Sequence, residues 1–132
     1  MNLAKEEYFK YWFYSAEDLI VRSVDSFNEK RYDWCLFLGH RALMKILKAH
    51  YIIKNDTPPP DVNDLLQLSY LSNIKLNEEQ ILFFDIANQF YSYVRFPTDK
   101  LKFYKIVPKE FAVINLKKII EHYKWLQSLL IY

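Results

Sequence analysis

The scarcity of glycine constrains the fold of this chain more than any other feature of its sequence. Gly39 is the single glycine among 132 residues. Hairpin turns and phosphate-cradling loops depend on glycine, because it adopts backbone angles that other residues avoid. This composition argues against β-hairpins, barrels and glycine-rich phosphate loops, and the sequence predicts an all-α fold.

Apolar residues that recur at steps of three and four predict four long helices and one short helix. The first covers residues 5–28, and the second ends at the polar, proline-rich stretch 55–60. A short helix over residues 62–71 follows, with Asp61 as its N-cap. A fourth starts after Asn77, which has capping-box spacing to Gln80, and it stops before Pro97. The fifth begins at Pro108, because proline suits a first helical turn.

Each long helix is expected to bury one apolar stripe, and antiparallel up-down packing of the four is the simplest arrangement. The stripes comprise Tyr8, Trp12, Ala16, Leu19, Ile20, Val24 and Phe27; Cys35, Leu38, Gly39, Ala42, Leu43, Ile46, Ala49 and Ile53; Ile81, Phe84, Ala87, Phe90, Tyr91 and Val94; and Ala112, Leu116, Ile119, Ile120, Tyr123, Leu126 and Leu130. Gly39 inside a helix indicates close approach of a neighbouring helix.

The apolar content predicts a single domain over residues 1–132, since 52% hydrophobic residues suffice for one sizeable core. Aromatic residues make up 18% of the chain, more than a small bundle comfortably hides, and this surplus predicts a homodimer. The net charge of +2 is not that of a strongly basic nucleic-acid binder, although a local basic patch stays open. The lone Cys35, the lack of a signal peptide and the lack of a membrane-length apolar run favour a cytoplasmic protein.

Four residue clusters resemble the motifs of HEPN domains. They are Trp12, Ala16, Asp18 and Leu19; Cys35 followed by HRALMKILKA from His40 to Ala49; the Asn63-Asp64-Leu65 segment after three prolines; and Tyr91, Arg95, Phe96 and Pro97. The resemblance spans about residues 12–97. It implies a HEPN-like bundle of four long helices plus one short helix, assembled as a homodimer.

The resemblance also implies two kinds of activity. Many HEPN proteins are encoded beside a minimal nucleotidyltransferase, as toxin–antitoxin pairs, and others are metal-independent ribonucleases with an R-x4-6-H motif. No histidine follows Arg95 at that spacing, and Lys100 stands near the place where it would lie. Lysine of ordinary pKa stays protonated, so it can bind phosphate but cannot act as a base. The loop histidine of the family is replaced by Asn63.

The candidate binding residues are therefore Arg95, Lys100, Lys48, Lys45 and Tyr91. Arg95 is expected either to cap the end of its helix or to clamp a phosphate together with Lys100. Lys45 and Lys48, with Arg41 one turn earlier, form either a solvated face or an extension of the same basic groove. Tyr91 either packs in the interior or stacks on a base. No metal-binding or cofactor-binding motif occurs, and His40 and His50 are too far apart on their helix to share a metal.

Three functional hypotheses remain open from the sequence. The leading one is a non-catalytic homodimeric module that binds nucleotide or RNA phosphate and partners a separately encoded nucleotidyltransferase subunit. The second is a metal-independent ribonuclease toxin that uses Arg95 with an unconventional proton donor. The third is a purely structural interaction module.

Overall fold

The computed structural model describes residues 2–95 and 107–130, apart from the side chains of residues 93–95. These residues form five helices and no strand: α1 (Leu3–Asn28), α2 (Tyr32–Lys54), α3 (Leu65–Leu71), α4 (Glu78–Arg95) and α6 (Lys109–Ser128). The predicted all-α, HEPN-like architecture of four long helices and one short helix is confirmed. None of the described helices has the length and apolar character that crossing a membrane requires.

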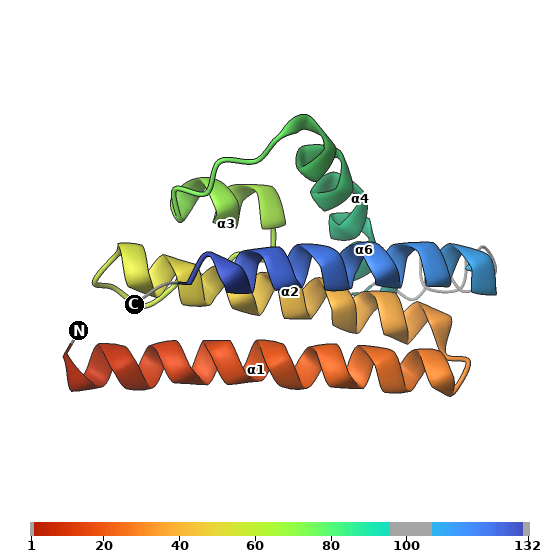
Figure 1. The fold of residues 1–132 in the computed structure, drawn as a ribbon, viewed down its shortest axis with the longest axis horizontal. Coiled ribbons are helices and arrows are strands. Elements are labelled where there is room, and N and C mark those ends of the chain that lie inside the picture. Colours follow the sequence, from red (N-terminus) through yellow and green to blue (C-terminus); the bar gives the residue numbers. More distant parts are fainter. Residues whose placement is uncertain (1, 96–106, 131–132) are drawn as a thin grey trace.

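Helix α2 is the centre of the structure, because it packs against each of the other four described helices. Figure 1 shows α1, α2 and α6 side by side, with α4 inclined to them. α1 runs opposite to α2, whereas α6 runs in the same direction as α2 (Figure 1). This order agrees with up-down connectivity, since α4 returns the chain before α6 begins.

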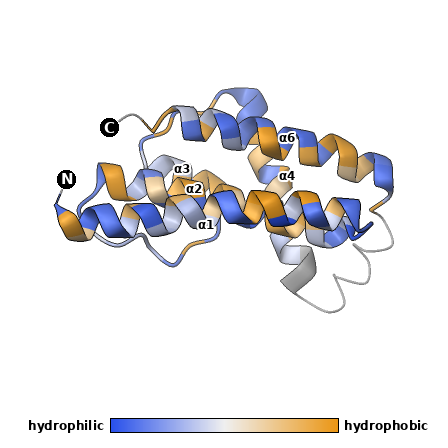
Figure 2. Ribbon diagram, turned by 60° about the horizontal axis from the view of Figure 1, so that its bottom comes forward, coloured by the Kyte–Doolittle hydropathy of each residue, from blue (hydrophilic) through white to orange (hydrophobic). Residues whose placement is uncertain are grey.

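The hydrophobic core consists mainly of side chains from α2, α4 and α6. Figure 2 shows hydrophobic and hydrophilic residues alternating around α1 and α6, as expected of amphipathic helices. The largest fully buried apolar side chains are Leu36, Leu43, Ile46, Leu47, Leu65, Leu68, Phe84, Phe90, Ile119 and Leu126. Burial of this apolar surface is the main stabilising contribution to the fold.

Gly39 lies where α2 and α6 come closest. A Cβ atom at this position would collide with the side chain of Ile119. The predicted close approach of a neighbouring helix is therefore confirmed, and it explains why a residue with poor helix propensity occurs in mid-helix.

The predicted start of the fourth helix is also confirmed. Asn77 Oδ1 accepts a hydrogen bond of 2.8 Å from the Gln80 backbone N–H, and the Asn77 N–H donates to Gln80 Oε1 at 2.9 Å. These two bonds form the expected capping box.

The predicted start of the short helix was wrong. It begins at Leu65, and Asp64 rather than Asp61 is its N-cap, with Oδ1 accepting from the N–H groups of Leu66 and Gln67. The chain is still turning at Val62, whose N–H donates to the carbonyl of Pro60. The last helix begins at Lys109, one residue after Pro108, which serves as its N-cap.

Two residues of the predicted stripes are exposed instead of buried. Tyr8 is 54% exposed and its neighbour Phe9 is buried, so the first turns of α1 face the core through a different residue. Ile81 is 44% exposed, because the start of α4 buries Phe83 and Phe84 instead.

Candidate functional site

Three basic residues form a stripe along one face of α2. Arg41, Lys45 and Lys48 are spaced by four and three residues, which places them on successive turns of the same face. None of the three makes an ion pair or a hydrogen bond with a described residue. We call these three residues the cationic stripe.

Aromatic rings lie against the cationic stripe. Lys48 Nζ lies 5.2 Å from the ring centroid of Trp12, and Lys45 Nζ lies 5.5 Å from the centroids of both Tyr11 and Trp12. The Arg41 guanidinium carbon lies 6.0 Å from the centroid of Phe37. These distances are those of cation–π contacts, which offset part of the cost of taking a cation out of water.

Lys48 is nearly buried, with only 5% of its surface exposed. The solvated face that was one interpretation of these lysines is therefore wrong for Lys48. Burial lowers its pKa below the ordinary value for lysine, the repulsion of Lys45 and Arg41 acts in the same direction, and the charge of Asp61 opposes both. Burial and Arg41 likewise lower the pKa of Lys45. Lys48 is thus covered along most of its side chain, and no described carboxylate lies at ion-pair distance from its ammonium group.

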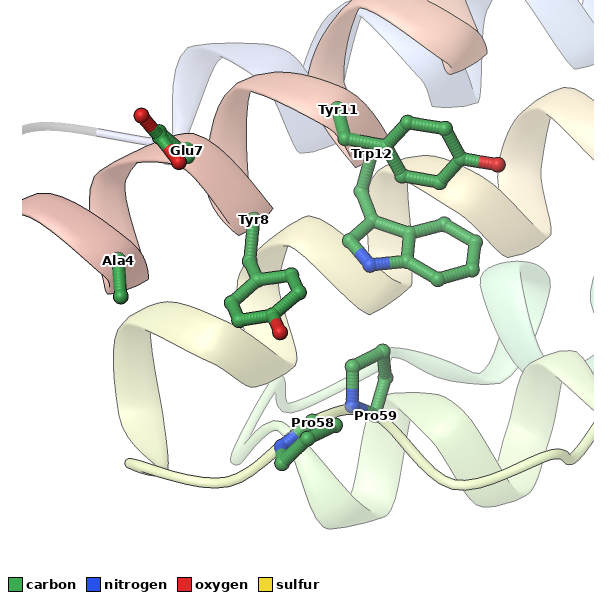
Figure 3. A pocket seen from close by; sticks show the side chains of 7 residues that line it. All are labelled: Ala4, Glu7, Tyr8, Tyr11, Trp12, Pro58 and Pro59. Carbon is green, nitrogen blue, oxygen red and sulfur yellow. The ribbon is translucent and has the colours of Figure 1, made fainter.

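A pocket of about 570 Å³ lies on the α1 side of the cationic stripe. It is lined by Ala4, Glu7, Tyr8, Tyr11, Trp12, Pro58 and Pro59, and we call it the aromatic pocket. Figure 3 shows the rings of Tyr8 and Trp12 reaching from α1 toward the two prolines of the loop. Its volume is within the range of small-molecule sites.

A polar network joins the loop before α3 to α2 and α4. Asn88 Oδ1 accepts from the Leu65 N–H at 3.0 Å and lies 3.3 Å from His40 Nε2, and Asn88 Nδ2 donates to Asp64 Oδ1 at 2.9 Å. Asn63 Nδ2 donates to the Tyr91 hydroxyl at 3.1 Å. The Asn63-Asp64-Leu65 segment, a motif in the sequence, therefore fixes the loop against the bundle.

Tyr91 is half-buried beside this polar network. Its ring stacks on Phe37 at a centroid distance of 5.7 Å and lies 5.2 Å from the ring of His40. The expected packing role of Tyr91 is thus observed. Phe37 also contacts Arg41, so Tyr91 adjoins one end of the cationic stripe.

The two histidines of α2 are buried. Burial is the main reason that the pKa of His40 falls to about 4, although the side chain of Asn88 and the backbone of Asn63 favour the charged ring. His50 Nε2 donates to the Leu126 carbonyl at 2.7 Å, and burial lowers its pKa as well. Both rings are therefore neutral at pH 7 and packed in the interior. In the described part of the chain, no three His, Cys, Asp or Glu side chains gather to hold a metal ion.

The structure brings together some of the predicted site residues. Lys45 and Lys48 are neighbours on α2, and Tyr91 of α4 stacks on Phe37, which contacts Arg41 at one end of the cationic stripe. α4 ends at Arg95, but the Arg95 side chain and all of Lys100 lie outside the described residues. The aromatic pocket was not predicted from the sequence. The signals that could have indicated it were the spacing of Tyr8 and Trp12 and the prolines of the loop.

A model of the HEPN domain matches residues 9–129. No curated protein and no solved structure matches the chain.

Proposed function

Because the chain belongs to the HEPN domain family, we propose that it is a homodimeric, non-catalytic module that binds nucleotide or RNA through phosphate. In this proposal it partners a separately encoded minimal nucleotidyltransferase, as in a toxin–antitoxin pair, and acts in the cytoplasm as a single domain. Membership of the family supports a nucleotide- or RNA-related role, and the binding chemistry is argued from the cationic stripe.

The observation that carries the proposal is the Lys48 side chain, which is only 5% exposed and makes no ion pair or hydrogen bond with a described residue. An isolated charge inside a protein lowers the stability of the fold by roughly several kcal/mol, and natural structures normally place an opposite charge beside it. Among the described residues, the face of Trp12 and the more distant charge of Asp61 favour the Lys48 ammonium, while Lys45 and Arg41 add further positive charge. An anionic ligand with several oxygens, such as a phosphate, supplies the missing partner.

The non-catalytic part of the proposal rests on the positions of the histidines. No histidine occurs between Arg95 and His122, and His122 Nδ1 lies 2.6 Å from the carbonyl of Lys118 on its own helix. His40 and His50 are neutral and buried. In the proposal, Arg95 and Lys100 bind phosphate and neither exchanges protons with it.

The homodimer is supported by large apolar side chains, an aromatic one among them, that remain on the surface away from the aromatic pocket. Phe111, Val113 and Ile114 are exposed on α6, and Leu82 and Ile86 are exposed on α4. Exposed aromatic residues are typical of interfaces, because they bury a large area at a small entropic cost.

Calorimetric titration of the metal-free protein with tripolyphosphate tests the proposal. We expect binding that weakens as salt is added, since counterions compete for the same charge. Lys48→Met should reduce the affinity about tenfold or more, because hydrogen bonds to charged groups contribute about 1.5–3 kcal/mol. The matched control is Lys124→Met, which removes the same charge from an exposed position on α6.

Two results would contradict the proposal. Equal losses in the Lys48 and Lys124 variants would mean that tripolyphosphate responds only to net charge. RNA fragments with 2′,3′-cyclic ends, produced by the wild type and absent with Arg95→Ala, would establish the ribonuclease alternative instead.

A further inference from the structure

Trp12 belongs to both the cationic stripe and the aromatic pocket. Its ring contacts the ammonium groups of Lys45 and Lys48, and it also lines the pocket beside Tyr8 and Pro59 (Figure 3). Neither lysine lines the pocket itself, so the pocket and the cationic stripe meet at Trp12 and form a surface of two parts. A ligand that fills the pocket and extends past Trp12 reaches the two lysines.

The two parts of this surface favour different chemistry. The aromatic pocket offers rings and prolines, and Glu7 is the one charged residue among the seven that line it. The lysines beside Trp12 offer positive charge that has no ion-pair partner in the part of the chain that the structure describes. The complementary ligand has a flat apolar part and an anionic part joined by a short linker.

We propose that the aromatic pocket holds the base of a nucleoside phosphate whose phosphate group rests on Lys45 and Lys48. This inference rests on the proposed function and names the ligand for the lysine part of that site. Bases stack on aromatic side chains whatever their identity, and lysines hold the backbone phosphates of single strands. A base inside a duplex has both faces covered by its neighbours, so the ligand is a free nucleotide or an unpaired nucleotide of a single strand.

The length of the cationic stripe agrees with this ligand. Arg41 and Lys48 are seven residues apart, which is about 10 Å along the helix axis. That distance exceeds the size of one phosphate group. The stripe can therefore contact a diphosphate, or the phosphate of the following nucleotide in a single strand.

A proline-rich peptide is the main rival ligand, since such peptides bind grooves lined by aromatic rings. It would bring no anion to Lys45 and Lys48, which make no ion pair with a described residue. The positive charge beside Trp12 therefore favours the nucleotide.

Fluorescence of Trp12 provides the test. The variant Trp34→Phe/Trp125→Phe leaves Trp12 as the only tryptophan in the chain. It is titrated with adenosine diphosphate, tripolyphosphate, a short single-stranded RNA, the matching RNA duplex and a proline-rich peptide. Tyr8→Ala removes one ring of the pocket, and Tyr14→Ala is the matched control. Both tyrosines lie on α1, they are 54% and 58% exposed, and only Tyr8 lines the pocket.

We expect adenosine diphosphate to change the Trp12 emission. Tyr8→Ala should weaken its binding about fivefold or more, the effect of losing one stacking partner, and should leave tripolyphosphate binding unchanged. Tyr14→Ala should change neither. Stronger binding of the single-stranded RNA than of the nucleotide would identify the strand as the source of the ligand, and the reverse order would identify the free nucleotide.

Several outcomes would overturn the inference. In one outcome, tripolyphosphate binding depends on Lys48, while the nucleotide binds no tighter than tripolyphosphate and leaves the Trp12 emission unchanged. In that case the proposed function stands and the base pocket is refuted. Equal effects of the two tyrosine variants would refute the base pocket as well. The base pocket is also refuted if the RNA duplex changes the Trp12 emission as much as the single strand does. A change caused by the proline-rich peptide alone refutes it as well. If neither polyphosphate nor nucleotide binds, the proposed function fails together with the inference.

Discussion

Replacing Lys48 by methionine should make the protein more stable. The substitution keeps most of the length and apolar stem of the side chain. It removes the charge of a residue that is only 5% exposed and has no ion-pair partner among the described residues. The other half of the prediction is the loss of phosphate binding described above. Together they would show that Lys48 is retained for binding at a cost in stability, a trade-off common at functional sites.

The expected magnitude follows from the surroundings of the ammonium group. Moving a lysine charge out of water costs several kcal/mol (roughly) in a real protein. The cation–π contact with Trp12 offsets about 1–2 kcal/mol of this cost when the cation is desolvated. Asp61 offsets a further part from beyond ion-pair distance. Because the ammonium group is not fully buried, solvent screens part of this cost. We therefore expect the free energy of unfolding to rise by up to about 1 kcal/mol, which for a chain of this size raises Tm by up to about 4 °C.

The pH dependence gives the prediction a second, independent signature. The folded-state pKa of Lys48 lies below its ordinary value of 10.5, so folding disfavours the charged form. The resulting penalty is fully present below the folded-state pKa, and it disappears as the pH rises through that pKa toward 10.5. Over that interval the wild type should gain stability relative to Lys48→Met.

Urea unfolding followed by far-UV circular dichroism measures both effects, with Lys124→Met as the control. Lys124 is exposed, so its replacement should change the unfolding free energy by no more than about 0.5 kcal/mol. A loss of about 1 kcal/mol or more in Lys48→Met would refute the reasoning. It would mean that the Lys48 charge already has a favourable partner in the folded protein.

Two further predictions concern the interior. Gly39→Ala should lower the free energy of unfolding by about 1–2 kcal/mol, because the overpacking cost of about 1–3 kcal/mol exceeds the gain in helix propensity. Adding Ile119→Val removes the atom nearest to the new Cβ, so it should recover part of that loss in a double-mutant cycle. Purely additive effects of the two substitutions would contradict the close contact. Burial raises the pKa of the Cys35 thiol to about 11, so a thiol reagent should modify it at neutral pH only as fast as the protein opens, whereas reaction at the rate of a free thiol would show that the site is accessible.

Local signals in the sequence were sufficient to predict the number and order of the helices. The Asn77–Gln80 capping box depends on residues three apart, so it could be predicted without knowledge of the rest of the fold. The start of the short helix could not be predicted in the same way. Asp61 and Asp64 are both acceptable N-caps, and the turn at Pro60 together with the bond from Asn88 to Asp64 selects the second.

The candidate site was harder to predict, because it depends on contacts between distant segments. Lys48 has the spacing of a surface lysine, but it is 5% exposed and its ammonium group contacts Trp12 of α1. The aromatic pocket exists because Pro58 and Pro59 lie opposite Tyr8 and Trp12. Periodicity along one helix carries no information about either contact.

The central position of α2 also bears on how the chain folds. α1 and α2 are joined by a connection of only three residues, so their pairing closes a short loop and can form early. α3, α4 and α6 each pack on α2 as well, and thus find their main partner already in place. A folding nucleus made of the first two helices would also bring Trp12 onto Lys48 at the first stage, before the loop that completes the pocket arrives.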